Sequence, residues 1–294
     1  MKLVLLLKNV SVANLRNGSL TSNEIANTLT DYVSSITDSD TPSDANNVLS
    51  IAEIEMNIDK INTNFTTDDS NDAVFFMVRP ISEADHNETI TLGASFSTVN
   101  KGEIITNNNK DNAINKPLSA AAIIANDSIV GVTRLKIFII NEPVLYKNID
   151  NHTNKTVASS IIVASVTRNN SQLQSPMNIS LFFQIIPALK PNITNVDYYC
   201  SFYDTNTSQW SESGCTKPRY NSQWDRYECS CNHLTSFALI WLPNTQYTQN
   251  LSAQDIASLV FQSISIICFI IVISHALFSR FQDPFMRLQA YDLL

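Results

Sequence analysis

The sequence predicts an α+β chain in which a small helical subdomain precedes an antiparallel β-sandwich and a single transmembrane helix follows. Three patterns indicate this order: apolar stripes at helical spacing near the N-terminus, β-branched and aromatic runs bounded by turn residues, and an uncharged apolar segment near the C-terminus. Several short strands with turn signals between them favour an antiparallel sandwich over parallel βαβ units.

The composition excludes several classes of function. The 294 residues carry a formal net charge of −8, which argues against a nucleic-acid partner. Only five residues are glycine, and neither glycine-rich phosphate-binding motif occurs. Charged residues make up 16%, below the usual quarter or so of a soluble protein. We therefore expect no nucleic acid and no cofactor. The composition alone leaves an ordinary cytosolic enzyme possible, and it is the distribution of residues along the chain that excludes one.

Two apolar stripes predict the helical subdomain. Thr21 and Glu24 can form a capping box that opens the first helix. The apolar residues that follow recur at helical spacing: Ile25, Leu29, Val33 and Ile36. A break rich in Pro, Ser and Asp precedes a second stripe of four residues: Ile51, Ile54, Ile58 and Ile61. The expected helical subdomain covers residues 17–66.

The strand-like runs begin at Ala73. They are bounded by Asn, Pro, Ser and Asp clusters, which are typical of turns. The runs occupy residues 73–80, 89–99, 134–146, 157–167 and 178–186. A polar stretch, Asn107–Pro117, is interpreted as a solvated loop. The expected sandwich covers residues 67–243.

Residues 256–278 contain no Asp, Glu, Lys or Arg. A helix of this length, about 35 Å, is long enough to cross a hydrocarbon core of roughly 30 Å. Asp255 precedes the segment and Arg280 and Arg287 follow it, which predicts that residues 279–294 form a cytoplasmic tail. We expect a plasma-membrane protein with an extracellular N-terminus; the alternative is a buried core helix.

Twelve Asn-x-Ser/Thr acceptors all precede this apolar segment, which fits an ectodomain that carries glycans on its surface. They are Asn9, Asn17, Asn64, Asn87, Asn126, Asn151, Asn154, Asn169, Asn178, Asn192, Asn206 and Asn250. The route into the secretory pathway is not evident. Lys8 and Asn9 interrupt the apolar N-terminus before a signal-peptide core is complete. We expect a fragment or a signal upstream of Met1; a very short signal ending at Ala13 is the alternative.

The cysteines are Cys200, Cys215, Cys229, Cys231 and Cys268. The first four form an even cluster, which predicts two disulfides in an extracellular context, and the last lies in the apolar segment. Cys229 and Cys231 are too close in an extended chain to pair with each other. Each then pairs with one of the earlier two, which leaves two connectivities. A zinc site built from this cluster and His233 is the alternative, although the spacing lacks the paired units of common zinc modules.

A strand that is apolar on both faces follows the cysteines. Alternate residues would face one side, Phe237, Leu239 and Trp241, and the other side, Ala238, Ile240 and Leu242. Such a strand is buried within a fold, and Pro243 stops it. Thr235 lies at the start of this strand, two residues after His233. Taken alone this spacing is a weak signal, because a lone histidine there is usually structural.

The stretch from Cys200 to Trp241 carries more information. It reads C…W-S-x-x-G-C…C-x-C-N-H-L-T-S-F-A and closely resembles the GPCR proteolysis site of adhesion-class G-protein-coupled receptors, a motif also found in the polycystin family. The matching residues are Cys200, Trp210, Ser211, Gly214, Cys215, Cys229, Cys231, Asn232, His233, Leu234, Thr235, Phe237 and Ala238. Helices followed by a sandwich that ends in this motif resemble the GAIN domain, and the apolar segment resembles the first transmembrane helix of such a receptor.

The resemblance implies autoproteolysis between Leu234 and Thr235. In the family the histidine is the general base, so His233 would take the proton of the Thr235 hydroxyl, which attacks the Leu234 carbonyl. The amide becomes an ester, which water then hydrolyses. This is at most a single-turnover reaction, with no external substrate and no metal.

The resemblance also implies a role for the strand that follows the cleavage point. In the receptor family this strand is a tethered agonist, and its counterparts here are Thr235, Phe237, Leu239, Ile240 and Trp241. The cleaved strand would stay bound to its own domain. We expect a truncated receptor, for which a seven-helix bundle or a G protein is a partner only in a longer form; the extracellular ligand is unspecified. The alternatives are a polycystin-like membrane protein and an uncleaved adhesion ectodomain anchored by one span.

Overall fold

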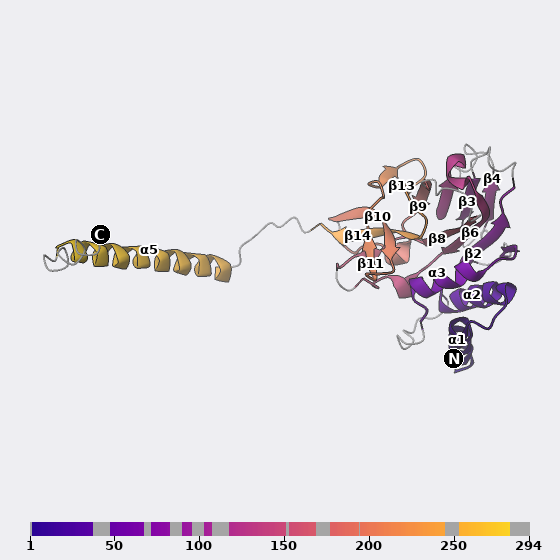
Figure 1. Ribbon diagram of the computed structural model, residues 1–294, viewed down its shortest axis with the longest axis horizontal. Coiled ribbons are helices and arrows are strands. Elements are labelled where there is room, and N and C mark those ends of the chain that lie inside the picture. Colours follow the sequence, from indigo (N-terminus) through magenta and orange to yellow (C-terminus); the bar gives the residue numbers. More distant parts are fainter. Residues whose placement is uncertain are drawn as a thin grey trace, which may run out of the picture. The chain divides into compact units, whose positions relative to one another are not determined.

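The computed structural model describes most of the chain in separate stretches. They are residues 2–37, 48–67, 72–82, 90–95, 103–107, 118–150, 153–168, 177–193, 195–244 and 253–282. The chain forms two compact units, Met1–Asn244 and Thr245–Leu294. The first unit holds the helices and sheets, and the second holds one long helix (Figure 1). Most of the expected polar loop, residues 108–117, lies outside the described residues.

Three helices open the first unit: α1 (Lys2–Asn17), α2 (Ser22–Thr37) and α3 (Ile51–Lys60). The predicted capping box is present, because the backbone N–H of Thr21 donates to the Glu24 carboxylate at 2.8 Å and the N–H of Glu24 donates to the Thr21 hydroxyl at 3.5 Å. Ser50 and Glu53 cap α3 in the same way. All eight residues of the two predicted stripes are buried. Helix α1 extends the helical layer to Lys2, N-terminal to the expected boundary at residue 17.

The strands form the two antiparallel sheets that the sequence predicts. In order, the first sheet contains β1 (Phe65–Thr66), β2 (Val74–Pro80), β6 (Val132–Ile140), β8 (Ile161–Arg168), β14 (Ser236–Pro243), β10 (Val196–Asp204) and β11 (Gln209–Ser211), with β7 (Thr156–Val157) also paired to β14. The second contains β12 (Arg219–Asn221), β13 (Arg226–Cys231), β9 (Ile179–Phe183), β5 (Ala120–Ile124), β3 (Ile90–Ser95) and β4 (Glu103–Asn107). Short 3₁₀ turns connect some of them: η3 (Asn126–Ile129), η4 (Val144–Tyr146) and η5 (Pro187–Leu189).

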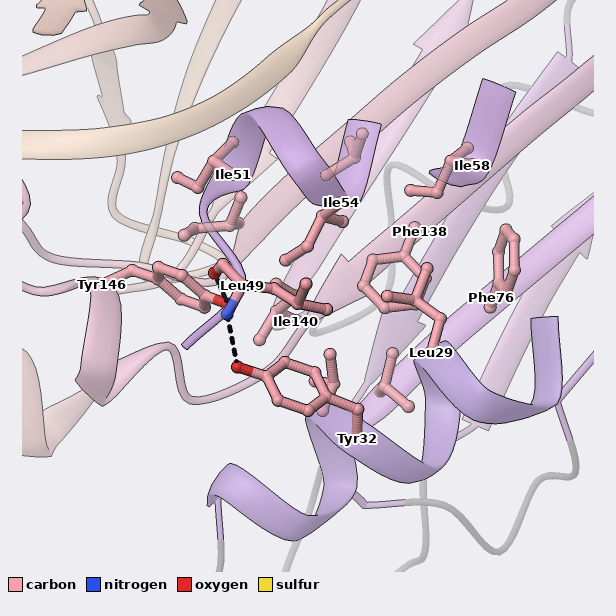
Figure 2. Close-up of a cluster of buried hydrophobic side chains, with 14 of the residues drawn as sticks. Leu29, Tyr32, Leu49, Ile51, Ile54, Ile58, Phe76, Phe138, Ile140 and Tyr146 are labelled. Atoms are coloured by element: carbon pink, nitrogen blue, oxygen red, sulfur yellow. Dashed lines mark hydrogen bonds between the residues drawn. The ribbon is translucent and has the colours of Figure 1, made fainter. Parts of the chain in front are cut away.

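The first sheet lies between the helices and the second sheet, so it is buried on both faces. Along β2, Phe76 packs with the helices whereas Phe75 packs against the second sheet. Figure 2 shows the helix-facing core, in which Leu49 contacts two tyrosines. The backbone N–H of Leu49 donates to the Tyr32 hydroxyl and its carbonyl accepts from the Tyr146 hydroxyl, each at 2.8 Å. These bonds fix the segment that leads into α3.

Some strand predictions differ from the structure. The run predicted over residues 134–146 ends as a strand at Ile140, and the chain then makes a 3₁₀ turn after Pro143, which cannot donate to a ladder. The run predicted over residues 89–99 is described only as β3, and residues 96–99 lie outside the described stretches. The sequence did not predict β5, because three of its five residues are alanine, which is depleted in strands.

The second unit contains α5 (Ala253–Gln282). Within it, Val260–Phe278 has a mean hydropathy of 2.2, and none of this window is buried inside the protein. Asp255 and Arg280, expected as flanks, are helical residues of α5, and Arg287 lies outside the described residues. By length and composition, this helix is able to cross a membrane.

Candidate functional site

The segment Asn232–Thr235 connects β13 of the second sheet to β14 of the first. Strand β14 lies between β8 and β10, and its pairing with β10 runs without interruption from Phe237, opposite Phe202, to Pro243, opposite Val196. The N–H of Ala164 donates to the Thr235 carbonyl at 3.0 Å. The bond between Leu234 and Thr235 is therefore placed where the chain enters the middle of a sheet.

Two disulfides hold this connection. Cys200 on β10 pairs with Cys229 on β13, which joins the two sheets. Cys215 pairs with Cys231, the last residue of β13. The structure thus selects one of the two connectivities that the sequence left open. Because all four sulfur atoms are in disulfides, the alternative zinc site does not hold.

Gly214 lets the backbone approach Asn232 closely. Gly214 has a φ of +77°, and a Cβ at this position would lie 2.3 Å from the Asn232 side-chain oxygen. The N–H of Asn232 also donates to the Gly214 carbonyl at 3.0 Å. The same side-chain oxygen lies 3.0 Å from Nδ1 of His233. With an amide oxygen as partner, Nδ1 carries the proton, and Nε2 is left as the nitrogen with a free lone pair.

The imidazole of His233 lies among aromatic rings. Its centroid is 4.4 Å from that of Phe202 in an edge-on arrangement and 5.5 Å from that of Phe237. Its Nε2 is buried and has no hydrogen-bond partner among the described residues. Burial lowers the pKa of His233 below its ordinary value, so the ring is neutral near pH 7. A neutral, unpartnered ring nitrogen is able to accept a proton.

Thr235 contacts a residue that sequence reasoning did not identify. Its hydroxyl donates to Oε1 of Glu55 at 2.8 Å, and the N–H of Ser236 donates to the same oxygen at 2.8 Å. Among the described contacts, none joins the hydroxyl to His233. Glu55 lies on α3 next to the apolar stripe, between Ile54 and Ile58. That position marks it as close to the sheet, but nothing in the sequence links it to Thr235.

A cavity of about 210 Å³ opens beside the Leu234–Thr235 bond. Its walls come from α3, β8 and the connection itself: Glu55, Asp59, Val163, Ala164, Ser165, Val166, Leu234 and Thr235. The Ser165 hydroxyl donates to the Asp59 carboxylate, and Nζ of Lys136 donates to the Asp59 backbone carbonyl at 2.7 Å. Because a water molecule occupies about 30 Å³ in the liquid, the cavity has room for water next to this bond.

The sequence profile described as "GPS: GAIN subdomain B" matches residues 45–245, more than half of the chain. This chain belongs to the GAIN subdomain B family. The predicted resemblance to the GAIN domain of adhesion-class receptors is thereby confirmed. The match begins before α3, so it includes the helix that carries Glu55.

The full extracellular region of zebrafish Gpr126/Adgrg6 is a solved structure similar to this chain. The TM-score is 0.45 and the identity is 18%, over 78% of this chain and 33% of that chain. This chain therefore corresponds to about a third of the length of that structure.

The remaining predicted site residues of the GAIN domain are placed as follows. Phe237, Leu239 and Ile240 are fully buried, and Trp241 is half-buried. Six of the sequon asparagines are exposed: Asn17, Asn64, Asn154, Asn178, Asn192 and Asn206. Asn9 lies in α1, and Asn126 is the first residue of η3. Four others lie outside the described residues: Asn87, Asn151, Asn169 and Asn250.

Proposed function

We propose that this GAIN domain cuts its own chain between Leu234 and Thr235. The observation that carries the proposal is the buried Nε2 of His233. This nitrogen is neutral and has no hydrogen-bond partner among the described residues. His233 precedes Thr235 by two residues, and Thr235 comes directly before the first residue of β14. Threonine is a weak nucleophile at neutral pH, and a positioned base speeds such a step by roughly 10²–10⁴-fold.

The proposed reaction has two steps. In the first, Nε2 of His233 takes the proton of the Thr235 hydroxyl, Oγ1 bonds to the Leu234 carbonyl carbon, and the C–N bond breaks as the Thr235 nitrogen receives the proton. The product is an ester, and no atom has been gained or lost. In the second, a water molecule hydrolyses the ester, which leaves a carboxylate on Leu234 and restores the Thr235 hydroxyl. The adjoining cavity provides space for that water.

The proposal requires one movement. A hydroxyl has a single proton to donate, and Thr235 donates it to Glu55. Its hydroxyl must therefore leave Glu55 and turn toward His233 before the attack. This contact also favours a second candidate function, in which the domain remains uncleaved as a structural ectodomain anchored by α5.

After cleavage, we propose that β14 stays in place and acts as a tethered agonist strand once it is released. Its retention is supported by the uninterrupted pairing with β10 and by the burial of Phe237, Leu239 and Ile240. A seven-helix bundle and a G protein are its proposed partners in a longer form of the protein.

The proposed location is the plasma membrane, with the GAIN domain outside the cell and the C-terminus in the cytoplasm. The apolar window of α5 supports the membrane anchor. The exposed sequon asparagines support an extracellular glycoprotein, because acceptors must be accessible on the lumenal side.

The test compares variants of the full chain, made in a secretory host with a tag at the C-terminus, on denaturing gels after deglycosylation. We expect the wild type and Thr235→Ser to be cleaved, and Thr235→Ala and His233→Ala to be intact. Ser236→Ala is the matched control, since the Ser236 hydroxyl is buried without a hydrogen-bond partner in the described structure. Cleavage of the Thr235→Ala chain at the same position would rule out this nucleophile.

A further inference from the structure

Self-cleavage would create two charges where the intact chain has none. The amide between Leu234 and Thr235 is neutral, whereas hydrolysis leaves a carboxylate on Leu234 and an α-ammonium group on Thr235. Thr235 is only half-exposed, and its carbonyl is bound to the N–H of Ala164 within the sheet. A charge placed in such a partly buried position is costly unless an opposite charge meets it.

Glu55 already contacts the residue that would gain this charge. One carboxylate oxygen accepts hydrogen bonds from the Thr235 hydroxyl and from the Ser236 N–H, each at 2.8 Å. The nitrogen of Thr235 is bonded to the same Cα that carries this side chain and leads to Ser236. Cleavage therefore leaves the ammonium group close to the two atoms that Glu55 holds.

Within the described part of the chain, the charge of Glu55 is not matched by a cation. Among the described residues, no lysine or arginine forms an ion pair with it. Lys136 is nearby in the fold, but its Nζ donates to the backbone carbonyl of Asp59. The other carboxylate that lines the cavity, Asp59, accepts a hydrogen bond from the Ser165 hydroxyl and does not contact Thr235. Glu55 is thus the carboxylate in contact with the residue at the cleavage point.

We propose that Glu55 is the counter-ion for the new α-ammonium group of Thr235, and that helix α3 holds the C-terminal fragment in this way after cleavage. This inference rests on the proposed self-cleavage. Before cleavage Glu55 makes two hydrogen bonds to neutral donors; after cleavage it gains an ionic partner on the same residue. Release of β14 then requires separation of this pair as well as of the strand.

Glu55→Gln separates the role of Glu55 as a hydrogen-bond acceptor from its role as a counter-ion. The glutamine amide oxygen is able to accept the same two hydrogen bonds, so the intact chain keeps its contacts, but the negative charge is gone. Charge-assisted hydrogen bonds are stronger than neutral ones by roughly 1 kcal/mol, which corresponds to roughly a fivefold change in rate. Asp59→Asn is the matched control, because it removes a carboxylate from the same cavity without touching Thr235.

The experiment uses the full chain in detergent, immobilised through an N-terminal tag, and follows release of the C-terminal tag in a fixed concentration of urea. We expect the cleaved Glu55→Gln protein to release its fragment roughly fivefold faster than the wild type, and Asp59→Asn to match the wild type. In the uncleaved His233→Ala background, where no ammonium forms, we expect Glu55→Gln to lower the free energy of unfolding by less than it does in the cleaved protein, because only the two hydrogen bonds from Thr235 and Ser236 lose their ionised acceptor.

Equal release from the wild-type and Glu55→Gln proteins would overturn the counter-ion proposal and leave self-cleavage standing. The proposal also fails if Glu55→Gln weakens the uncleaved His233→Ala chain as much as the cleaved one, because the role would then be structural. A wild-type chain that is never cleaved overturns the proposed function itself, and the counter-ion proposal with it.

Discussion

Glu55 and Thr235 are 180 positions apart in the sequence, and a hydrogen bond of 2.8 Å joins their side chains. The contact links the helical layer to the first residue of the segment that enters the sheet as β14. Through this bond, α3 holds Thr235, the residue after the proposed cleavage point. The strand that follows, β14, is paired with β8 along one edge and with β10 along the other.

Gly214→Ala is expected to reduce cleavage by more than its loss of folding stability explains. The positive φ of Gly214 is unfavourable for alanine, at a cost of roughly 1–3 kcal/mol, and the new Cβ would displace the Asn232 side chain that orients His233. We expect a lower melting temperature and a smaller cleaved fraction on denaturing gels. Gly18→Ala is the control, since Gly18 also has a positive φ but no atom lies within 4 Å of the added Cβ. If both variants are cleaved equally well, the contact with Asn232 does not matter for the reaction.

The pKa of His233 is expected to lie below that of a free histidine. Burial lowers its pKa, so the folded protein binds a proton less readily than the unfolded chain, whose histidine titrates near 6.5. The contribution of His233 to stability is therefore fully present above pH 6.5 and is lost as the pH falls through the lower, folded value. Nuclear magnetic resonance of the histidine ring in the uncleaved Thr235→Ala chain measures this midpoint. A midpoint above 6.5 would mean that burial does not dominate.

Removal of the Cys215–Cys231 disulfide is expected to cost about 3 kcal/mol, the value for a closed loop of this size in the chain-entropy description. The paired Cys215→Ser and Cys231→Ser variant tests this by urea unfolding. We also expect less cleavage, because the bridge lies directly beside Gly214 and Asn232. Full cleavage in a destabilised variant would show that the bridge supports the fold but does not shape the site.

Replacing side chains of β14 with alanine is expected to lower the free energy of unfolding, and to lower it more where the side chain is more deeply buried. Phe237 is fully buried between the sheets, so Phe237→Ala should cost about 3–5 kcal/mol. Trp241 is half-buried near the end of the strand, and Trp241→Ala should cost clearly less. Thermal unfolding of both variants in the uncleaved His233→Ala background makes the comparison. Similar losses would mean that the strand is held mainly through its far end.

Much of this architecture follows from local pattern. The alternation of Phe237 and Leu239 with Ala238 and Ile240 predicts a strand buried on both faces, and these pairs do pack into different cores. The capping box at Thr21 is equally local. Contacts between residues far apart in the sequence do not follow from local pattern. The spacing of the cysteines allows two connectivities, and the partner of Cys229 depends on which strands lie side by side.

The role of Glu55 shows the same limit. A glutamate beside an apolar helical stripe is ordinarily a solvated residue, and its bond to Thr235 exists only because α3 packs across β8 beside the start of β14. The direction of the Thr235 hydroxyl, toward Glu55 instead of His233, is likewise a product of tertiary packing. The residue types of the motif indicate the chemistry, whereas the contacts that restrain it come from a distant part of the chain.

Self-cleavage between Leu234 and Thr235 is tested most directly by N-terminal sequencing, together with the intact mass, of the C-terminally tagged wild-type protein after deglycosylation. Self-cleavage at this site predicts a fragment that begins at Thr235 and ends at the tag. A folded protein that yields only the full-length chain, or a fragment that begins at another residue, would contradict self-cleavage at this site.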